Sequence, residues 1–186
     1  MNLPGTVGGD ERIRLFCALR LPDEALERFV SWQADVFAGV DDVRVVGKTN
    51  LHLTLAFLGH RPRLEVDDIV RELREAASTA EPMQLFVGRY RETRSVGMVT
   101  FEDEDGAAGR LAADLHARLA RLGVYEAEKR PWLPHLTVLR FRRPPRLRPE
   151  LPSVPPFSPS DAALYHSVLR SGGAQYEVVQ SVALGS

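Results

Sequence analysis

Residues 50–58 read NLHLTLAFL, and two polar side chains, His52 and Thr54, interrupt this otherwise apolar segment. Successive side chains of a strand point to opposite faces, so His52, Thr54 and Ala56 are predicted on one face. The other face then carries apolar residues suited to a core, namely Leu51, Leu53, Leu55 and Phe57. The segment therefore predicts a half-buried strand whose polar face displays a histidine and a threonine.

The same pattern recurs at residues 134–141, which read PHLTVLRF. Here His135 and Thr137 are predicted on one face, and Leu136 and Val138 on the other. A chain of this composition is expected to contain only about 0.2 His-x-Thr triplets by chance. Two copies in similar strand-like contexts, in corresponding places of the two half-chains, favour a functional pair over two unrelated core histidines.

Strands and helices alternate along the rest of the chain. Hydrophobic periodicity predicts strands at 13–21, 43–46, 51–58, 84–92, 96–103, 135–141, 162–169 and 176–184, and helices at 23–39, 64–77 and 106–123. Residues 1–11 are predicted to be a loose tail, and residues 12–186 a single domain. The proline-rich segment 149–160 is predicted to be an ordered crossover, because the strands after it are too few for a separate domain.

Composition excludes several classes of protein. A net charge of -1 provides no global field to attract a polyanion, so nucleic-acid contact would depend on a local basic cluster. Cys17 is the only cysteine, which excludes an internal disulfide and fits the reducing cytoplasm. The N-terminal residues lack the apolar centre of a signal peptide, and no apolar run approaches the roughly 20 residues of a membrane helix. We expect a soluble, monomeric cytoplasmic protein with no membrane contact.

The tetrapeptides His52-Leu53-Thr54-Leu55 and His135-Leu136-Thr137-Val138 resemble the signature of the 2H phosphoesterase superfamily, which is named for two His-x-Thr-x motifs. More closely, the chain resembles the bacterial and archaeal RNA 2',3'-cyclic phosphodiesterase family, also called the 2'-5' RNA ligase family. The segments that carry this resemblance are RLFCALRLPDE (14–24), NLHLTLAFLG (50–59), RPWLPHLTVLRF (130–141) and SVLRSGGAQYEVV (167–179). One departure is Leu133, where a basic residue before Pro134 is expected in many relatives.

The resemblance implies an α+β fold of two lobes related by a pseudo-twofold axis. Each lobe would consist mainly of antiparallel strands with outer helices, and the two motifs would face each other across a central cleft. Prediction of strands and helices in both half-chains is compatible with this architecture.

Two histidines suit the hydrolysis of a cyclic phosphodiester, which needs a base to deprotonate water and an acid to protonate the departing ribose oxygen. The hydroxyls of Thr54 and Thr137 can donate hydrogen bonds to the non-bridging phosphate oxygens. The residues alone do not assign the acid and the base. The resemblance implies that His52 is the proton donor to the leaving 3' oxygen and His135 the proton acceptor from water, which leaves a 2'-phosphate.

Residues 129–148 contain seven basic side chains and no acidic one, and they flank the second motif. Arginine binds phosphate through its planar guanidinium, so this run is a candidate RNA contact, although arginine-rich composition on a solvated surface explains it equally well. Arg130 and Arg140 are the predicted substrate-binding residues because they lie nearest the motif.

No metal ion or other cofactor is expected, because the chain has no His-Glu-x-x-His pattern and no phosphate-binding glycine loop. The predicted function is metal-independent hydrolysis of RNA ends that carry a 2',3'-cyclic phosphate, with reversible 2'-5' ligation as a side reaction. Two alternatives remain open: a related enzyme acting on a small cyclic phosphate or nucleotide, and a nucleotide-binding module without turnover.

Overall fold

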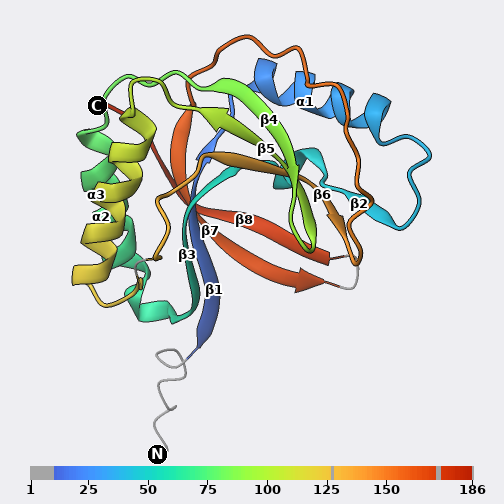
Figure 1. Cartoon of the computed structure of the whole chain (residues 1–186). Coiled ribbons are helices and arrows are strands. Elements are labelled where there is room, and N and C mark those ends of the chain that lie inside the picture. The colour runs from blue at the N-terminus through green and yellow to red at the C-terminus, as the bar shows by residue number, and fades with distance from the viewer. Residues whose placement is uncertain (1–10, 127, 171–172, 186) are drawn as a thin grey trace, which may run out of the picture.

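The protein, a computed structural model, is described at residues 11–126, 128–170 and 173–185. Two four-stranded antiparallel sheets form its centre, with the α-helices on their outer sides (Figure 1). The first sheet has the order β3-β1-β7-β8, with β1 at Arg12–Arg20, β3 at Leu53–Pro62, β7 at Asp161–Arg170 and β8 at Gly173–Val182. The second has the order β2-β6-β5-β4, with β2 at Val43–Val45, β4 at Phe86–Glu92, β5 at Val96–Glu102 and β6 at His135–Phe141.

The first sheet is covered by α2 (Val66–Ser78) and α3 (Ala107–Arg121), which pack side by side (Figure 1). Each buries an apolar stripe at helical spacing, with Ile69 and Leu73 on α2 and Leu115 and Leu119 on α3. His116 fastens α3 to the sheet, because its Nε2 lies 2.7 Å from the carbonyl oxygen of Leu55.

The second sheet is covered by α1 (Asp23–Val36). Phe29 on this helix is fully buried and packs edge-on against Phe101 and Phe157. Gln33 is also buried, and its Nε2 donates to the carbonyl oxygens of Val46 at 3.1 Å and Val138 at 2.9 Å. These bonds satisfy a polar side chain that burial would otherwise make costly, and they fix α1 against β6.

The bilobal α+β fold is confirmed, but the lobes are not the two half-chains. The first sheet joins β1 and β3 from the N-terminal half to β7 and β8 from the C-terminal half. The second joins β2 to β4, β5 and β6. The chain therefore crosses between the lobes several times, so the main core contains residues of both sheets and segments far apart in sequence lie close together.

Strands and helices lie close to the positions predicted from sequence, with small shifts at their ends. The second predicted helix starts at Val66, after a short 3₁₀ turn at Arg63–Glu65. Another 3₁₀ turn, Lys48–Asn50, precedes β3, so His52 lies just before that strand. Of the predicted tail, residues 1–10 lie outside the described residues, whereas the Glu11 carboxylate pairs with Arg63 at 2.9 Å.

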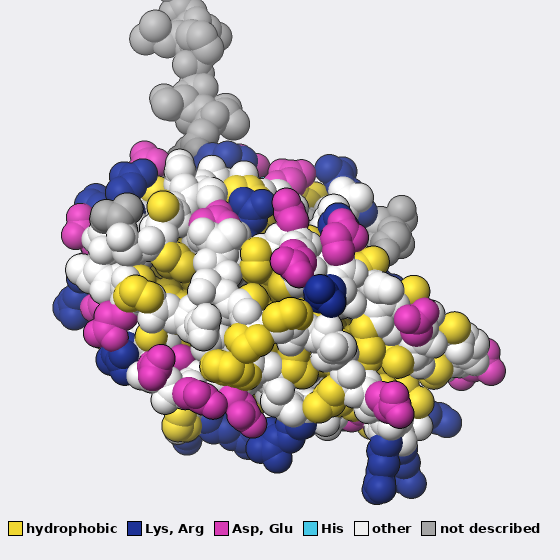
Figure 2. Space-filling view, turned by 90° about the horizontal axis from the view of Figure 1, so that it is seen from above, with side chains coloured by type: hydrophobic (Ala, Val, Ile, Leu, Met, Phe, Trp, Pro, Cys, Tyr) yellow, Lys and Arg dark blue, Asp and Glu magenta, His cyan; other side chains and the backbone are white. Residues whose placement is uncertain are grey.

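The proline-rich crossover is ordered, as predicted. Leu85 and Phe157 exchange two backbone hydrogen bonds of 2.9 and 3.1 Å, and Trp32 Nε1 donates to the carbonyl of Glu150 at 2.7 Å. Figure 2 views the molecule from above, on the face over which the crossover runs in Figure 1. Hydrophobic side chains gather at the centre of this face, and no histidine of the described residues is visible on it. None of the described helices is both long and apolar enough to cross a membrane.

Candidate active site

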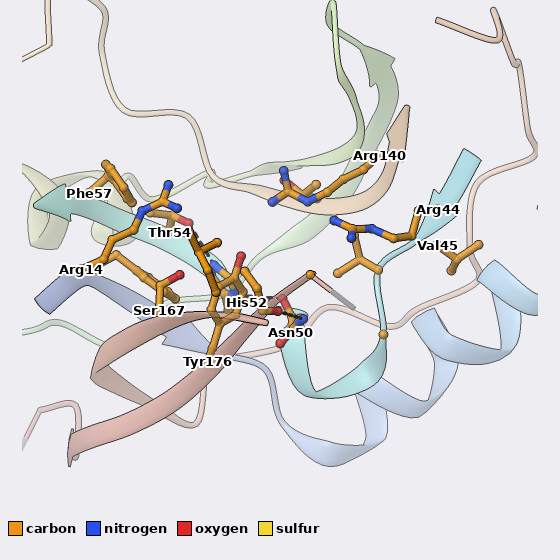
Figure 3. Close-up of a pocket in the computed structure, with 17 residues that line it drawn as sticks. Arg14, Arg44, Val45, Asn50, His52, Thr54, Phe57, Arg140, Ser167 and Tyr176 are labelled. Atoms are coloured by element: carbon orange, nitrogen blue, oxygen red, sulfur yellow. Dashed lines mark hydrogen bonds between the residues drawn. The ribbon is translucent and has the colours of Figure 1, made fainter. Parts of the chain in front are cut away.

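A cavity of about 630 Å³ is lined by residues of both sheets. Four of the residues predicted from sequence line it: His52, Thr54, Thr137 and Arg140. Figure 3 shows His52 and Thr54 near the middle of the cavity, with Arg14 and Phe57 toward one end and Arg44 and Arg140 toward the other. The remaining lining residues are Phe16, Val45, Val46, Gly47, Asn50, Ser167, Leu169, Gly173, Ala174 and Tyr176.

His52 is held by a backbone contact on one side of its ring. Nδ1 lies 2.8 Å from the carbonyl oxygen of Asn50, which can only accept, so Nδ1 carries a proton. In the neutral ring Nε2 is then the free acceptor, and it lies 3.1 Å from the Thr54 hydroxyl, which donates to it. Asn50 is itself fixed, because its Nδ2 donates to the carbonyl of Ala174 at 3.0 Å.

His135 repeats this arrangement in the other lobe. Its Nδ1 lies 2.9 Å from the carbonyl oxygen of Leu133, again two residues upstream. The unusual side chain at Leu133 does not affect this contact, which uses only the backbone. Both histidines are therefore oriented by the same local geometry, with Nε2 left to exchange protons. His135 itself is not among the lining residues, although Thr137 two positions later is.

Aromatic rings surround His52. The centroid of its ring lies 4.8 Å from Phe16, 5.2 Å from Tyr176 and 5.9 Å from Tyr165. Loss of hydration against these rings lowers the pKa of His52 to about 4, and the charges of Arg140 and His135 act in the same direction. The bond to Asn50 opposes the shift without cancelling it. His52 is therefore neutral near pH 7 in the unliganded protein.

A bulge in β3 changes the predicted strand faces beyond Thr54. Opposite β1, Cys17 pairs with Ala56 and Ala18 with Thr54, so Leu55 is an extra residue. Alternation is shifted there: Ala56 is 2% exposed, whereas Phe57 is 49% exposed and lines the cavity. The prediction that Phe57 belongs to the core and Ala56 to the polar face is therefore wrong.

Phe57 carries a partner that the sequence did not indicate. The guanidinium of Arg14, on β1, lies over its ring at 4.9 Å from the centroid. Both side chains line one end of the cavity (Figure 3). Aromatic rings and guanidinium planes are surfaces on which nucleobases stack.

The cavity is positively charged, although the net charge of the whole chain is only -1. Its lining contains three arginines, Arg14, Arg44 and Arg140, and none of its residues is acidic. Arg130, the other predicted substrate-binding residue, lies outside the lining. Of the basic run, Arg142, Arg143, Arg146 and Arg148 are exposed and also lie outside it. RNA contact by these four arginines stays a prediction.

One hydrogen bond and the arrangement of possible metal ligands also bear on the site. Trp132 Nε1 donates to the carbonyl of Thr54 at 2.8 Å, so the segment before the second motif is tied to the first motif. Among the described residues, no group of three or more His, Cys, Asp or Glu side chains is arranged to hold a metal ion. Function without a metal ion remains a prediction.

Comparison with known proteins assigns this chain to a family. The sequence model of the 2'-5' RNA ligase superfamily matches residues 21–166. The chain belongs to this superfamily. The resemblance drawn from the two motifs is thereby confirmed.

Relatives in this superfamily match over nearly the whole chain. The protein named RNA 2',3'-cyclic phosphodiesterase in Thermus thermophilus is 32% identical over 92% of this chain and 90% of its own length. The protein of the same name in Escherichia coli (strain K12) is 29% identical over 92% and 96%.

Solved structures agree with this assignment. The protein TT0787 of Thermus thermophilus superposes with a TM-score of 0.79 at 28% identity, covering 93% of this chain and 98% of that one. Escherichia coli LigT complexed with NADP+ superposes with a TM-score of 0.73 at 28% identity, covering 95% and 100%. The two-sheet fold is therefore shared along the full length of these superfamily members.

Proposed function

We propose that this chain hydrolyses the 2',3'-cyclic phosphate at the end of an RNA to a 2'-phosphomonoester. The observation that carries the proposal is the matched pair of histidines, each oriented by a carbonyl two residues upstream and followed two residues later by a threonine, beside a cavity with three arginines. The names of the relatives from Thermus thermophilus and Escherichia coli support the same substrate.

In the proposed reaction a water oxygen attacks phosphorus while the bond from phosphorus to the 3' oxygen breaks. His135 accepts the proton that water loses, and His52 donates a proton to the leaving 3' oxygen. The hydroxyls of Thr54 and Thr137 stabilise the negative charge that gathers on the non-bridging oxygens. Proton exchange with solvent then restores both histidines. The same groups support 2'-5' ligation when a 5'-hydroxyl replaces the water.

The depressed pKa of His52 sets a condition on this scheme. A ring that is neutral in the unliganded protein has no proton to donate from Nε2. A bound phosphate anion beside it favours the charged ring and raises its pKa, because opposite charges stabilise each other at short range. We infer that His52 takes up its proton together with the substrate. Positive charge on Arg140 opposes this uptake until the phosphate neutralises it.

The test is hydrolysis of an oligonucleotide with a 2',3'-cyclic phosphate end, in excess chelator, with the product identified by ³¹P NMR. We expect a single 2'-phosphomonoester, formed at the same rate with and without the chelator. A 3'-phosphate product would contradict the assigned leaving group. No hydrolysis by the folded protein would contradict the activity.

A further inference from the structure

The bulge in β3 lies directly after the first motif and contacts two side chains from other parts of the chain. Opposite β1, Leu55 is the extra residue, so the alternation of side chains along β3 shifts after Thr54. The shift turns Phe57 toward the cavity, which its ring and the Thr54 side chain both line (Figure 3). The bulge therefore decides which side chains after His52 can meet a substrate.

Two consecutive carbonyl groups at the bulge accept hydrogen bonds from ring N–H groups. Trp132 Nε1 donates to the carbonyl of Thr54 at 2.8 Å, and His116 Nε2 lies 2.7 Å from the carbonyl oxygen of Leu55. Because a carbonyl oxygen only accepts, Nε2 of His116 carries the proton. β3 lies at the edge of the first sheet, so backbone groups directed away from β1 depend on partners from elsewhere. Trp132 and His116 supply such partners for two adjacent residues.

Both donors are themselves held by packing. The His116 ring stacks on Tyr125, with centroids 4.6 Å apart and an angle of 25° between the planes. The rings of Trp132 and Tyr125 pack against the main core. Leu55 is buried, so loss of the His116 donor would leave the carbonyl of a buried residue without this bond, which is costly. The fixed donors therefore favour the bulged form of β3 over a regular strand.

We propose that Trp132 and His116 are positioning residues, which hold the β3 bulge in the shape that directs the Thr54 hydroxyl and the Phe57 ring into the cavity. This inference rests on the proposed function, in which Thr54 donates to a non-bridging phosphate oxygen. Both rings lie outside the cavity lining, so they act through the backbone that they bind. In a regular strand, Phe57 would share the face of Leu55 and would point into the core.

The experiment removes each ring N–H and keeps an aromatic ring. Trp132→Phe and His116→Phe each lose the donor and retain a ring for packing, whereas His116→Gln retains a donor in its amide. We expect both phenylalanine variants to lower kcat on a cyclic-phosphate oligonucleotide by about tenfold, because a small displacement of a catalytic group is costly. His116→Gln should recover part of this loss. Native kcat in both folded phenylalanine variants would overturn the proposal.

A matched control separates positioning from packing in general. Trp32 Nε1, on α1, also donates to a backbone carbonyl, that of Glu150 at 2.7 Å, and it lies outside the cavity lining. Trp32→Phe removes the same kind of bond and should keep the wild-type kcat. A fall in kcat as large as that of Trp132→Phe would show that loss of any such bond has this effect, and would overturn the assignment.

A double-mutant cycle tests whether Trp132 acts through Thr54. In the Thr54→Val background the hydroxyl is already absent, so Trp132→Phe should lower kcat by only about twofold, compared with about tenfold in the wild-type background. A role in stability alone predicts the same factor in both backgrounds. Equal factors would therefore contradict the positioning role.

Amide hydrogen exchange tests the bulge without relying on catalysis. If the folded wild-type protein hydrolyses no cyclic phosphate, the proposed function fails, whereas exchange at residues 54–57 can still be compared between wild type and the two phenylalanine variants. Faster exchange confined to these amides would support the role of the two rings in holding the bulge. Unchanged exchange in both variants would overturn it.

Discussion

The two histidine motifs share one anchor but differ in their surroundings. In both, Nδ1 donates to the carbonyl two residues upstream, at 2.8 Å for His52 and 2.9 Å for His135. Only His52 packs against three aromatic rings, and its pKa falls to about 4. The shared contact sets the tautomer, whereas the surroundings set the affinity for the proton. In the proposed reaction these similarly oriented rings perform opposite proton transfers, and His52 acts as the acid only after the bound phosphate raises its pKa.

The largest expected effect is the loss of either imidazole. His52→Ala and His135→Ala should each lower kcat on a cyclic-phosphate oligonucleotide by about 10²-fold or more, since each removes one proton transfer. His60→Ala is the control, because His60 is exposed and lies outside the cavity lining. Near-native turnover by either folded motif variant would show that one histidine alone suffices.

Replacing the motif threonines should lower kcat by a smaller factor than replacing the histidines, and the factor should differ between the two positions. Thr54 contacts Nε2 of its own histidine at 3.1 Å, so Thr54→Val removes both a partner of the ring and a donor to phosphate. We expect kcat to fall by about 10- to 100-fold, with Thr54→Ser retaining most of the activity. Thr137→Val should cost less, since it removes only the donor to phosphate. Steady-state kinetics of the three variants test this order, and equal losses in the two valine variants would contradict it.

The smallest expected effect is on the pH dependence of the free energy of unfolding. Because His52 has a pKa of about 4 when folded and near 6.5 when unfolded, the unfolded chain binds more protons between these values. The stability that neutral His52 contributes is therefore fully present above pH 6.5 and is lost as the pH falls toward 4. Between pH 7 and pH 4.5, wild type should lose about 2 kcal/mol more unfolding free energy than His52→Gln. Urea unfolding at the two pH values measures it, and parallel losses in both proteins would contradict the buried neutral ring.

Local patterns predicted the two motifs, because alternation of side chains along a strand is a property of adjacent residues, and the two-lobed fold was implied by the family resemblance that the motifs carry. Phe57 was assigned to the wrong face since the bulge at Leu55 depends on pairing with β1, which the strand's own sequence does not contain. Arg14 and Arg44 were missed for the same reason, because only the pairing of distant strands brings them to the cavity. Nearness to the motif in sequence selected Arg130 and Arg140 together, and only Arg140, within β6, lines the cavity.

The unequal roles of the two histidines are tested most directly by changing the leaving group. In a 2',3'-cyclic substrate with sulfur at the 3' position, the departing thiolate needs little protonation, because thiols have a pKa of only about 8.5. His52→Ala should recover most of its lost activity on this substrate, whereas His135→Ala should stay impaired because water must still be deprotonated. The ratio of rates on the sulfur and oxygen substrates, measured for both variants, decides the assignment. Rescue of His135→Ala instead, or equal rescue of both, would contradict the account.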